Sequence, residues 1–249
     1  SAWQSSAHCK EGTCLDFDGT ADYITADITI PTTDFTYSGW IYMDDNTDEI
    51  VFNASDDASG VNEIQIYIDS DETVESGLKW RAQINDTTVV GNSTEITANT
   101  WHHIAFTRGG SAVSFYLNGS VIDTGTNSDT MDFGTCDLLI GVDHDSDCVG
   151  SLGNYFDGRM DQLRVYDYER TPAQVAWEYN KGAPLGHWRL DECQGTTAYD
   201  SGSGGNNGTI TIGGSGDNTS AGTCNSGTGT EAWNNGSSGK RNASLDFDG

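Results

Sequence analysis

One loop of the sequence alternates carboxylates with other polar residues: Asp143-His144-Asp145-Ser146-Asp147. Calcium takes several oxygen ligands from carboxylates and carbonyls, so Asp143, Asp145 and Asp147 are candidate calcium ligands. The loop lacks the glycine and the terminal glutamate of a helix–loop–helix calcium site. A solvated acidic turn explains the same residues, and both interpretations stay open.

The neighbouring His102 and His103 are a second pair with ligating side chains. They lie in an apolar run, Trp101–Arg108, that is typical of a strand. Adjacent residues of a strand point to opposite faces, so the two imidazoles cannot bind one ion together. We expect them to be structural.

The charge balance limits the possible partners. The chain has 38 acidic and 11 basic residues, a net charge of -27. Nucleic acid is excluded as a partner, because phosphate binding needs clustered Lys and Arg. No apolar run is long enough to cross a bilayer, so we expect no membrane insertion. Divalent cations and plain solubility in salt both fit the acidic surface.

The cysteines indicate an oxidising compartment. There are six, none in a Cys-x-x-Cys motif, so a zinc site is not expected. The simplest of the possible pairings joins neighbours in sequence: Cys9–Cys14, Cys136–Cys148 and Cys193–Cys224. Disulfides favour an extracellular or cell-surface protein. Six reduced thiols in a cytosolic protein are the alternative.

Period-two alternation and turn residues predict an all-β fold, an antiparallel β-sandwich of the jelly-roll type with one short C-terminal helix. The helix begins after Thr171, with Pro172 at its first position and Gln174 completing a capping box. The predicted strands are Phe35–Met43, Glu49–Asn53, Glu63–Asp69, Leu78–Ile84, Trp101–Arg108, Ala112–Leu117, Ser120–Thr124, Leu138–Val142 and Phe156–Tyr168.

The chain also repeats itself. Residues 1–19 and 231–249 agree at eight of nineteen positions at one offset of 230 residues, including Trp3 with Trp233 and the final Leu-Asp-Phe-Asp-Gly. Such a match indicates one repeat period plus a short overlap into the next.

Several motifs, in this order, resemble the laminin-G-like jelly roll of the concanavalin A-like lectin/glucanase superfamily, and together they cover most of residues 14–182. They are Leu15–Gly19 with Asp22-Tyr23, Phe35–Trp40, Thr100–Ala105, Phe115–Gly119, Phe156–Tyr166 and the helix starting at Thr171.

The resemblance implies two parts. Residues 1–183 are similar to such a domain without its first strand, and residues 184–249 to the opening strand and Gly/Ser/Asn-rich segment of a following repeat. The opening strand would be Gly186–Glu192. The segment 194–244 is too poor in apolar residues to bury a core alone. We therefore expect 184–249 to pack on a neighbouring unit, head to tail, by strand donation.

The resemblance also implies ligands. Related domains often hold a structural calcium, which here gives Asp16, Asp18, Asp22 and Asp161 as candidates. Exposed aromatic residues stack on sugars in this family, and Trp80 and Tyr155 are the candidate platforms. The Glu-x-Asp-x-x-Glu strand of the related glycosidases is missing from the sequence, so no enzyme activity is expected.

The sequence thus predicts a structural repeat unit of an extracellular fibre or giant surface protein, with neighbouring copies as its partners. The alternative is a calcium-dependent carbohydrate- or protein-binding module of a cell-surface adhesin, with glycans among its partners.

Overall fold

The computed structural model describes residues 3–45, 47–55, 62–69, 79–85, 87–91, 96–144, 151–181, 184, 186–202, 204–214, 216–224, 229–235 and 243–247. The chain divides into two compact units, Ser1–Tyr179 and Asn180–Gly249. Each unit is described by itself.

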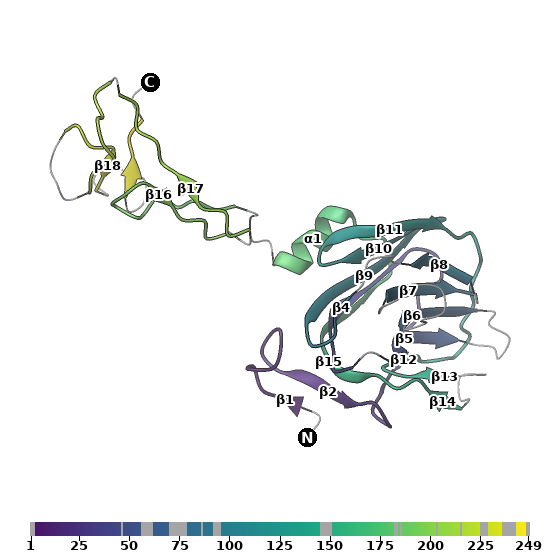
Figure 1. Cartoon of the computed structure of the whole chain (residues 1–249). Coiled ribbons are helices and arrows are strands. Elements are labelled where there is room, and N and C mark those ends of the chain that lie inside the picture. Colours follow the sequence, from purple (N-terminus) through teal and green to yellow (C-terminus); the bar gives the residue numbers. More distant parts are fainter. Residues whose placement is uncertain are drawn as a thin grey trace. The chain divides into compact units, whose positions relative to one another are not determined.

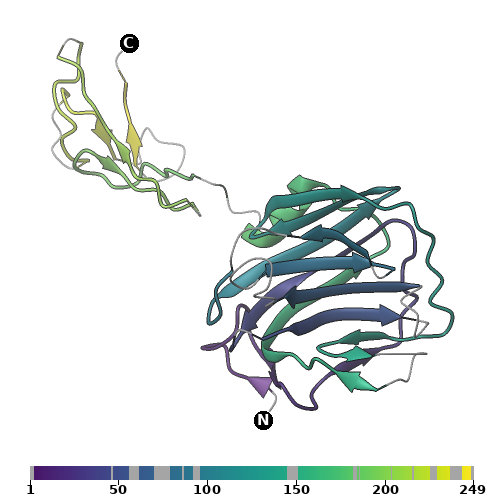
Figure 2. The same cartoon turned by 45° about the vertical axis from the view of Figure 1, so that its right-hand side comes forward.

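Unit 1 is a sandwich of two antiparallel sheets, whose layers are visible in Figures 1 and 2. One sheet of the described residues has the order β1 (Trp3–Gln4), β2 (Cys14–Asp18), β15 (Asp157–Tyr166), β4 (Phe35–Met43), β9 (Trp101–Gly109), β10 (Ala112–Leu117) and β11 (Ser120–Thr126). The other has the order β3 (Ile24–Ala26), β12 (Leu138–Ile140), β5 (Glu49–Ser55), β6 (Glu63–Asp69), β7 (Lys79–Ile84) and β8 (Thr87–Gly91). A short pair, β13 (Asp143–His144) and β14 (Leu152–Gly153), lies beside them.

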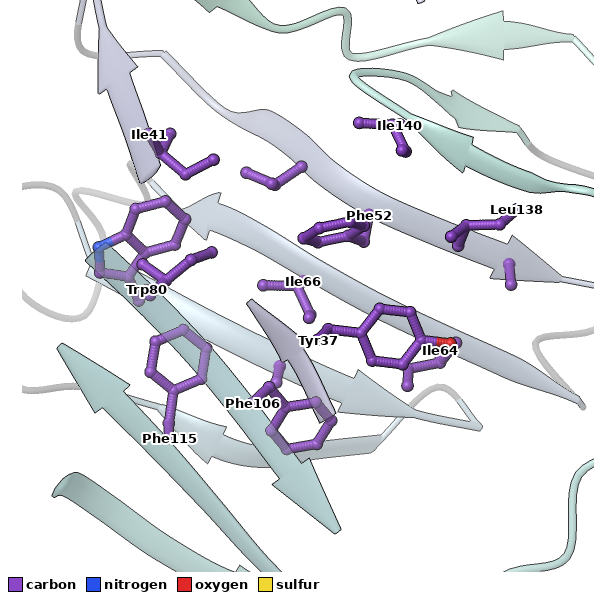
Figure 3. Packing of buried hydrophobic residues seen from close by; sticks show 14 of the residues in the cluster. Tyr37, Ile41, Phe52, Ile64, Ile66, Trp80, Phe106, Phe115, Leu138 and Ile140 are labelled. Carbon is purple, nitrogen blue, oxygen red and sulfur yellow. The ribbon is translucent and has the colours of Figure 1, made fainter. Parts of the chain in front are cut away.

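The core fills the space between the two sheets (Figure 3). Tyr37, Phe52, Ile66, Trp80 and Phe106 are all at most 2% exposed and come from five different strands. Alternation along each strand sends every second side chain inward, which is why the period-two pattern of the sequence predicts these strands correctly. Strand ends differ from the prediction by only a few residues.

Turn chemistry fixes the register of the hairpin between β10 and β11. Asn118 and Gly119 have φ of 50° and 77°. Two successive left-handed residues make the tight turn whose twist suits a two-residue hairpin, and Asn-Gly is the favoured pair. The Asn118 side chain also accepts a hydrogen bond from the His103 N–H at 3.0 Å.

The helix α1 (Pro172–Asn180) covers the outer face of β4 and β9. Its capping box forms as predicted: the Thr171 N–H donates to Gln174 Oε1 at 2.8 Å, and the Gln174 N–H donates to Thr171 Oγ1 at 3.3 Å. Val175 is buried against the sheet, and Tyr179 stacks on Trp40. Trp177, on the opposite side of α1, is 61% exposed.

A buried carboxylate ties α1 to the sheet. Glu178 accepts hydrogen bonds from Ser38 Oγ at 2.7 Å and from Arg164 at 2.8 Å, and lies 3.8 Å from the His103 imidazole. Burial alone would raise the pKa of Glu178. The nearby His103 imidazole, the hydrogen bond from Ser38 and the charge of Arg164 outweigh it and lower the pKa to about 2. His103 therefore packs beside the Glu178 carboxylate, whereas its neighbour His102 contacts the Thr97 carbonyl oxygen.

Unit 2 has a small core of its own. The described strands are β16 (Thr197–Ala198), β17 (Gly208–Thr209), β18 (Trp233–Asn234) and β19 (Ser244–Leu245). Ala198, Ile210, Ala221 and Trp233 are buried together. The expectation that this segment cannot bury a core alone is wrong, because one indole and one disulfide compensate for the scarcity of aliphatic residues.

The predicted opening strand Gly186–Glu192 is not a strand. Trp188 makes only an isolated bridge to Asp200 and is 46% exposed. Leu190 has a φ of 57°, a left-handed conformation that interrupts an extended run. The alternation of the sequence could not reveal this turn.

Candidate functional site

The repeated sequence forms the same hairpin twice. In unit 1, β1 pairs with β2, with Trp3 opposite Leu15 and Gln4 opposite Cys14. In unit 2, β18 pairs with β19, with Trp233 opposite Leu245 and Asn234 opposite Ser244. Every pair is shifted by 230 residues, so sequence repeat and strand register agree. We call β1 and β2 with their connection the first hairpin, and β18 and β19 the second hairpin.

The first hairpin is joined to the sandwich through β2. Its register against β15 sets Phe17 opposite Gly158 and Leu15 opposite Met160. The Phe17 ring is 2% exposed and meets Phe156 edge to face at 5.8 Å. On the other side of the hairpin, β1 is the last of the described strands in its sheet, and Trp3 is 68% exposed.

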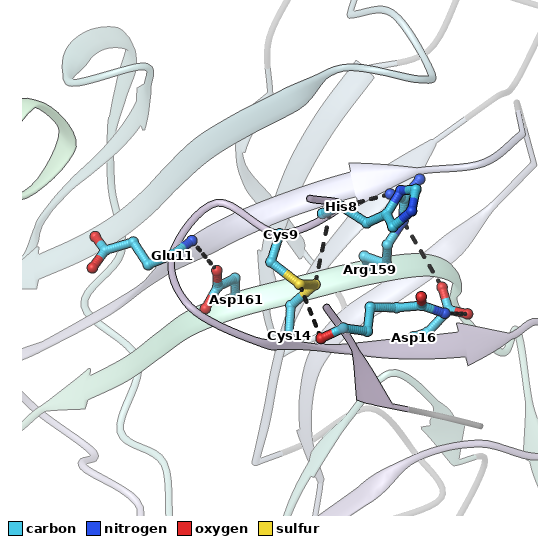
Figure 4. The surroundings of a disulfide bond; sticks show 8 residues. His8, Cys9, Glu11, Cys14, Asp16, Arg159 and Asp161 are labelled. Carbon is cyan, nitrogen blue, oxygen red and sulfur yellow. Dashed lines mark hydrogen bonds and ion pairs between the residues drawn. A yellow bond between two sulfur atoms is a disulfide. The ribbon is translucent and has the colours of Figure 1, made fainter. Parts of the chain in front are cut away.

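A disulfide and three polar contacts hold the loop of the first hairpin (Figure 4). Cys9 and Cys14 are bonded, as predicted. The Glu11 N–H donates to Asp161 Oδ2 at 2.7 Å, and Arg159 donates to the His8 carbonyl oxygen at 3.1 Å. The Lys10 ammonium lies 3.7 Å from the centre of the Trp40 ring. This loop is therefore fixed on the outer face of the sheet.

The second hairpin has the opposite pattern of burial. Trp233 is 3% exposed, and its indole N–H donates to the Gly195 carbonyl oxygen at 2.9 Å. Its backbone N–H donates to the Ala221 carbonyl oxygen at 3.1 Å. Phe247, which corresponds to Phe17, is 68% exposed. The first hairpin is thus packed at Phe17 and exposed at Trp3. The second hairpin is packed at the corresponding tryptophan and exposed at the corresponding phenylalanine.

The candidate calcium ligands near the first hairpin have protein partners. Asp16 accepts a hydrogen bond from Gln4 at 2.7 Å and lies 3.8 Å from Arg159. Asp18 accepts from the Thr20 N–H and hydroxyl, which lower its pKa. Asp161 is 6% exposed and bound by the Glu11 N–H, and Asp22 is half-buried. In the structure, the side chains of these four residues do not form a group that could hold one ion.

A different set of carboxylates gathers where β2 and β4 end and β15 begins. Burial, then the negative charges of Asp45 and Asp44, raise the pKa of Asp157. Burial, followed by the charge of Asp45, raises the pKa of Glu49 to about 9. Glu49 is 1% exposed, and its Oε2 has no hydrogen-bond partner. Sequence reasoning missed Glu49, because alternation assigns no cost to a carboxylate at the start of a strand.

Asp143 lies in a polar hollow on the outer face of the six-stranded sheet. Its Oδ1 accepts hydrogen bonds from Asn53 at 2.5 Å and from Gln65 at 2.9 Å, and its Oδ2 from Asn154 at 3.4 Å. The hollow has a volume of about 210 Å³, and Tyr67 is among its lining residues. Tyr67 was missed by the sequence analysis, although its outward position in β6 follows from the alternation of that strand.

The remaining acidic candidates, Asp145 and Asp147, lie outside the described residues, so the loop they form with Asp143 is not described. Within the residues that are described, no three His, Cys, Asp or Glu side chains form a group that could hold a metal ion.

One proposed sugar platform is wrong. Trp80 is 0% exposed and stacks near Phe115 in the core. It shares its strand face with Ala82 and Ile84, both also buried, so the alternation of β7 already placed it inward. Tyr155 is half-buried and stays a prediction.

Two disulfides are present among the described cysteines. Cys9–Cys14 closes the first hairpin, and Cys193–Cys224 crosses unit 2. Both match the predicted pairing. Cys148 lies outside the described residues, and with it the predicted Cys136–Cys148 pair. In the part of the chain that is described, none of the helices is long and apolar enough to cross a membrane.

The sandwich, its polar hollow and its half-packed hairpin define the fold of a carbohydrate- or protein-binding module. The family model of the concanavalin A-like lectin/glucanases superfamily, in its laminin-G form, matches residues 18–176. The chain belongs to this family, as the resemblance of its motifs predicted.

Solved structures agree with this fold. A heptameric SAP-like pentraxin from Limulus polyphemus is 21% identical, with a TM-score of 0.51 over 65% of this chain and 78% of that one. Domain 4 of AbnA, an extracellular GH43 arabinanase from Geobacillus stearothermophilus solved with arabinotriose, is 21% identical, with a TM-score of 0.54 over 68% and 77%. A search of curated proteins finds no match. At these identities the likeness concerns the fold, and the absence of enzyme activity stays a prediction.

Proposed function

We propose that this chain is a structural repeat unit of an extracellular fibre or giant surface protein, and that its copies join head to tail through the repeated hairpin. The supporting observation is the complementary burial of the two hairpins. The first hairpin has Phe17 buried and Trp3 exposed, and the second has Trp233 buried and Phe247 exposed. A contact between unlike surfaces of successive copies produces a fibre when the rotation from one copy to the next does not close a ring.

Cell-surface or extracellular location follows from two features. Disulfides persist in oxidising compartments. The Cys9–Cys14 and Cys193–Cys224 bonds, together with a laminin-G-like domain, are typical of secreted proteins.

Electron microscopy and sedimentation of the purified full chain test assembly. We expect concentration-dependent linear particles, and a chain ending after residue 181 should stay monomeric under the same conditions. A full chain that remains monomeric at every concentration, with both units folded, would overturn the proposal.

A second candidate function is glycan binding in the polar hollow. Sugar sites combine an aromatic ring with a few convergent polar groups, and Tyr67, Gln65 and Asp143 lie together here. One of the similar structures, from Bacteroides ovatus, is described as a putative carbohydrate binding protein, 20% identical with a TM-score of 0.50 over 79% of this chain and 57% of that one.

A glycan array tests this candidate, with and without calcium. Tyr67→Ala should abolish any binding, whereas Tyr23→Ala, which changes an exposed tyrosine outside the hollow, should not. Binding that survives Tyr67→Ala would exclude the hollow.

A further inference from the structure

The two hairpins differ in how firmly each is held where it lies. The first hairpin has the Cys9–Cys14 bond and the Glu11–Asp161 and Arg159–His8 hydrogen bonds. The second hairpin has glycine and serine at the two cysteine positions, Gly239 and Ser244, and cannot form that disulfide. The second hairpin therefore lacks the covalent bond that closes the first hairpin.

The surroundings of Trp233 form a socket. We define the Trp233 socket by Gly195, Ala198, Ile210, Ala221 and Cys224, which surround or hydrogen-bond this residue. The Ala232 and Trp233 N–H groups donate to the carbonyl oxygens of Ser220 and Ala221 at 3.0 and 3.1 Å. Residues 220–221 thus lie beside the chain at the start of β18, with an isolated parallel bridge between Ser220 and Glu231.

Most of these contacts could be made equally well by the first hairpin. Two of them use backbone N–H groups and one uses an indole N–H, and Ala2 and Trp3 carry the same groups as Ala232 and Trp233. The outer edge of β1 is the end of its sheet in the described residues. An unpaired edge of this kind accepts an added strand. Trp3, at 68% exposure, is a large aromatic side chain that burial would stabilise.

We infer that the Trp233 socket of one copy binds the first hairpin of a second copy of this chain. Trp3 takes the place of Trp233, segment 220–221 pairs with the edge of β1, and the second hairpin is released. In a single copy the second hairpin occupies the socket and competes with assembly. The inference rests on the proposed head-to-tail function and identifies the two surfaces that meet. The interface is the one already formed once inside unit 2.

Three variants of the full chain test this exchange. Trp3→Ala should reduce the sedimenting fraction at least tenfold without changing the melting temperature of unit 1, because Trp3 is exposed. Trp233→Phe keeps an aromatic ring in the small core of unit 2 but removes the indole hydrogen bond to Gly195, and it should raise the sedimenting fraction at a given concentration several-fold. Trp177→Ala removes an equally exposed indole on α1 and should leave assembly unchanged.

Hydroxyl-radical footprinting of the wild-type chain supplies a readout that does not depend on variants. On assembly, Trp3 should become protected while Trp233 becomes reactive. If instead Phe17 becomes reactive and Phe247 protected, the second hairpin has replaced the first on the sandwich, and the inference is wrong. Protection of Trp3 in a monomer would mean that the socket binds its own chain, which also overturns it.

Head-to-tail assembly and the socket exchange can be disproved separately. If the full chain never assembles, the proposed function fails. If it assembles and Trp3→Ala assembles equally well, the head-to-tail function stands and the socket exchange alone is wrong.

Discussion

Trp3 and Trp233 have the same strand register in two hairpins of one chain, yet 68% of one side chain and 3% of the other is exposed. The difference comes from their surroundings and not from the hairpins. Trp233 has the socket of unit 2 around it, and in unit 1 the edge of β1 has no described neighbour. Phe17 and Phe247 differ in the opposite sense, at 2% and 68%. The first hairpin therefore buries its phenylalanine and exposes its tryptophan, and the second hairpin does the reverse.

Glu49 makes unit 1 less stable as the pH rises. Its pKa is about 9 in the folded protein and 4.5 for an ordinary glutamate. The unfolded chain loses this proton first, so the contribution is fully present below pH 4.5 and is lost as the pH rises through 9. Glu49→Gln keeps the shape without the charge. Its melting temperature should match the wild type near pH 5 and exceed it by several degrees at pH 9. A difference that is constant with pH would contradict this assignment.

Glu178 should act in the opposite direction. Its pKa is about 2 in the folded protein and 4.5 as a reference, so its stabilisation is present above pH 4.5 and is lost as the pH falls through 2. One pKa unit corresponds to about 1.4 kcal/mol. Glu178→Gln should lower the free energy of unfolding by a few kcal/mol at pH 7 and by much less at pH 2. Denaturant unfolding at both values measures it, with Glu169→Gln, at the loop before α1, as the matched control.

The sequence predicted the sandwich well because its strands obey one physical rule. Phe35–Met43 and Ala112–Leu117 have the bounds that alternation and turn residues indicated. Helix α1 was found from its capping box for the same reason, since capping is local chemistry. The repeat of Trp3 at Trp233 has a structural counterpart, because the two residues have the same register in their hairpins.

The site was harder to predict because it depends on contacts between distant residues. Asp161 accepts a hydrogen bond from Glu11, 150 residues away in the sequence, and its role as a calcium ligand stays a prediction. Glu49 is buried beside Asp157 at the start of β15, and no local sequence pattern predicts this contact. The burial of Trp80, in contrast, could have been predicted from the alternation of β7. The prediction of a sugar platform at Trp80 did not take this alternation into account.

The second disulfide should be more important to its unit than the first. Cys193 and Cys224 are 31 residues apart, which corresponds to about 4 kcal/mol of loop entropy in the unfolded chain, against about 2 kcal/mol for the short Cys9–Cys14 loop. Unit 2 also has the smaller core. Replacing Cys193 and Cys224 by serine should expose residues 186–247 to limited proteolysis while unit 1 stays intact. Replacing Cys9 and Cys14 is the control, and equal resistance of unit 2 in both variants would contradict the prediction.

Calcium binding remains a prediction. In the structure, Asp157 is a better candidate ligand for the ion than Asp161. Negative charges on Asp45, Asp44, Asp16 and Asp18 raise the pKa of Asp157 after burial has done so. A divalent cation beside this group would relieve the repulsion, since hard cations take carboxylate oxygens. Millimolar calcium should therefore raise the melting temperature of unit 1, and a chelator should reverse the rise. Asp157→Asn should remove most of the response, whereas Asp27→Asn, at an exposed aspartate beyond β3, should keep it. A melting temperature that is the same in calcium and in chelator would leave these carboxylates as a solvated acidic edge.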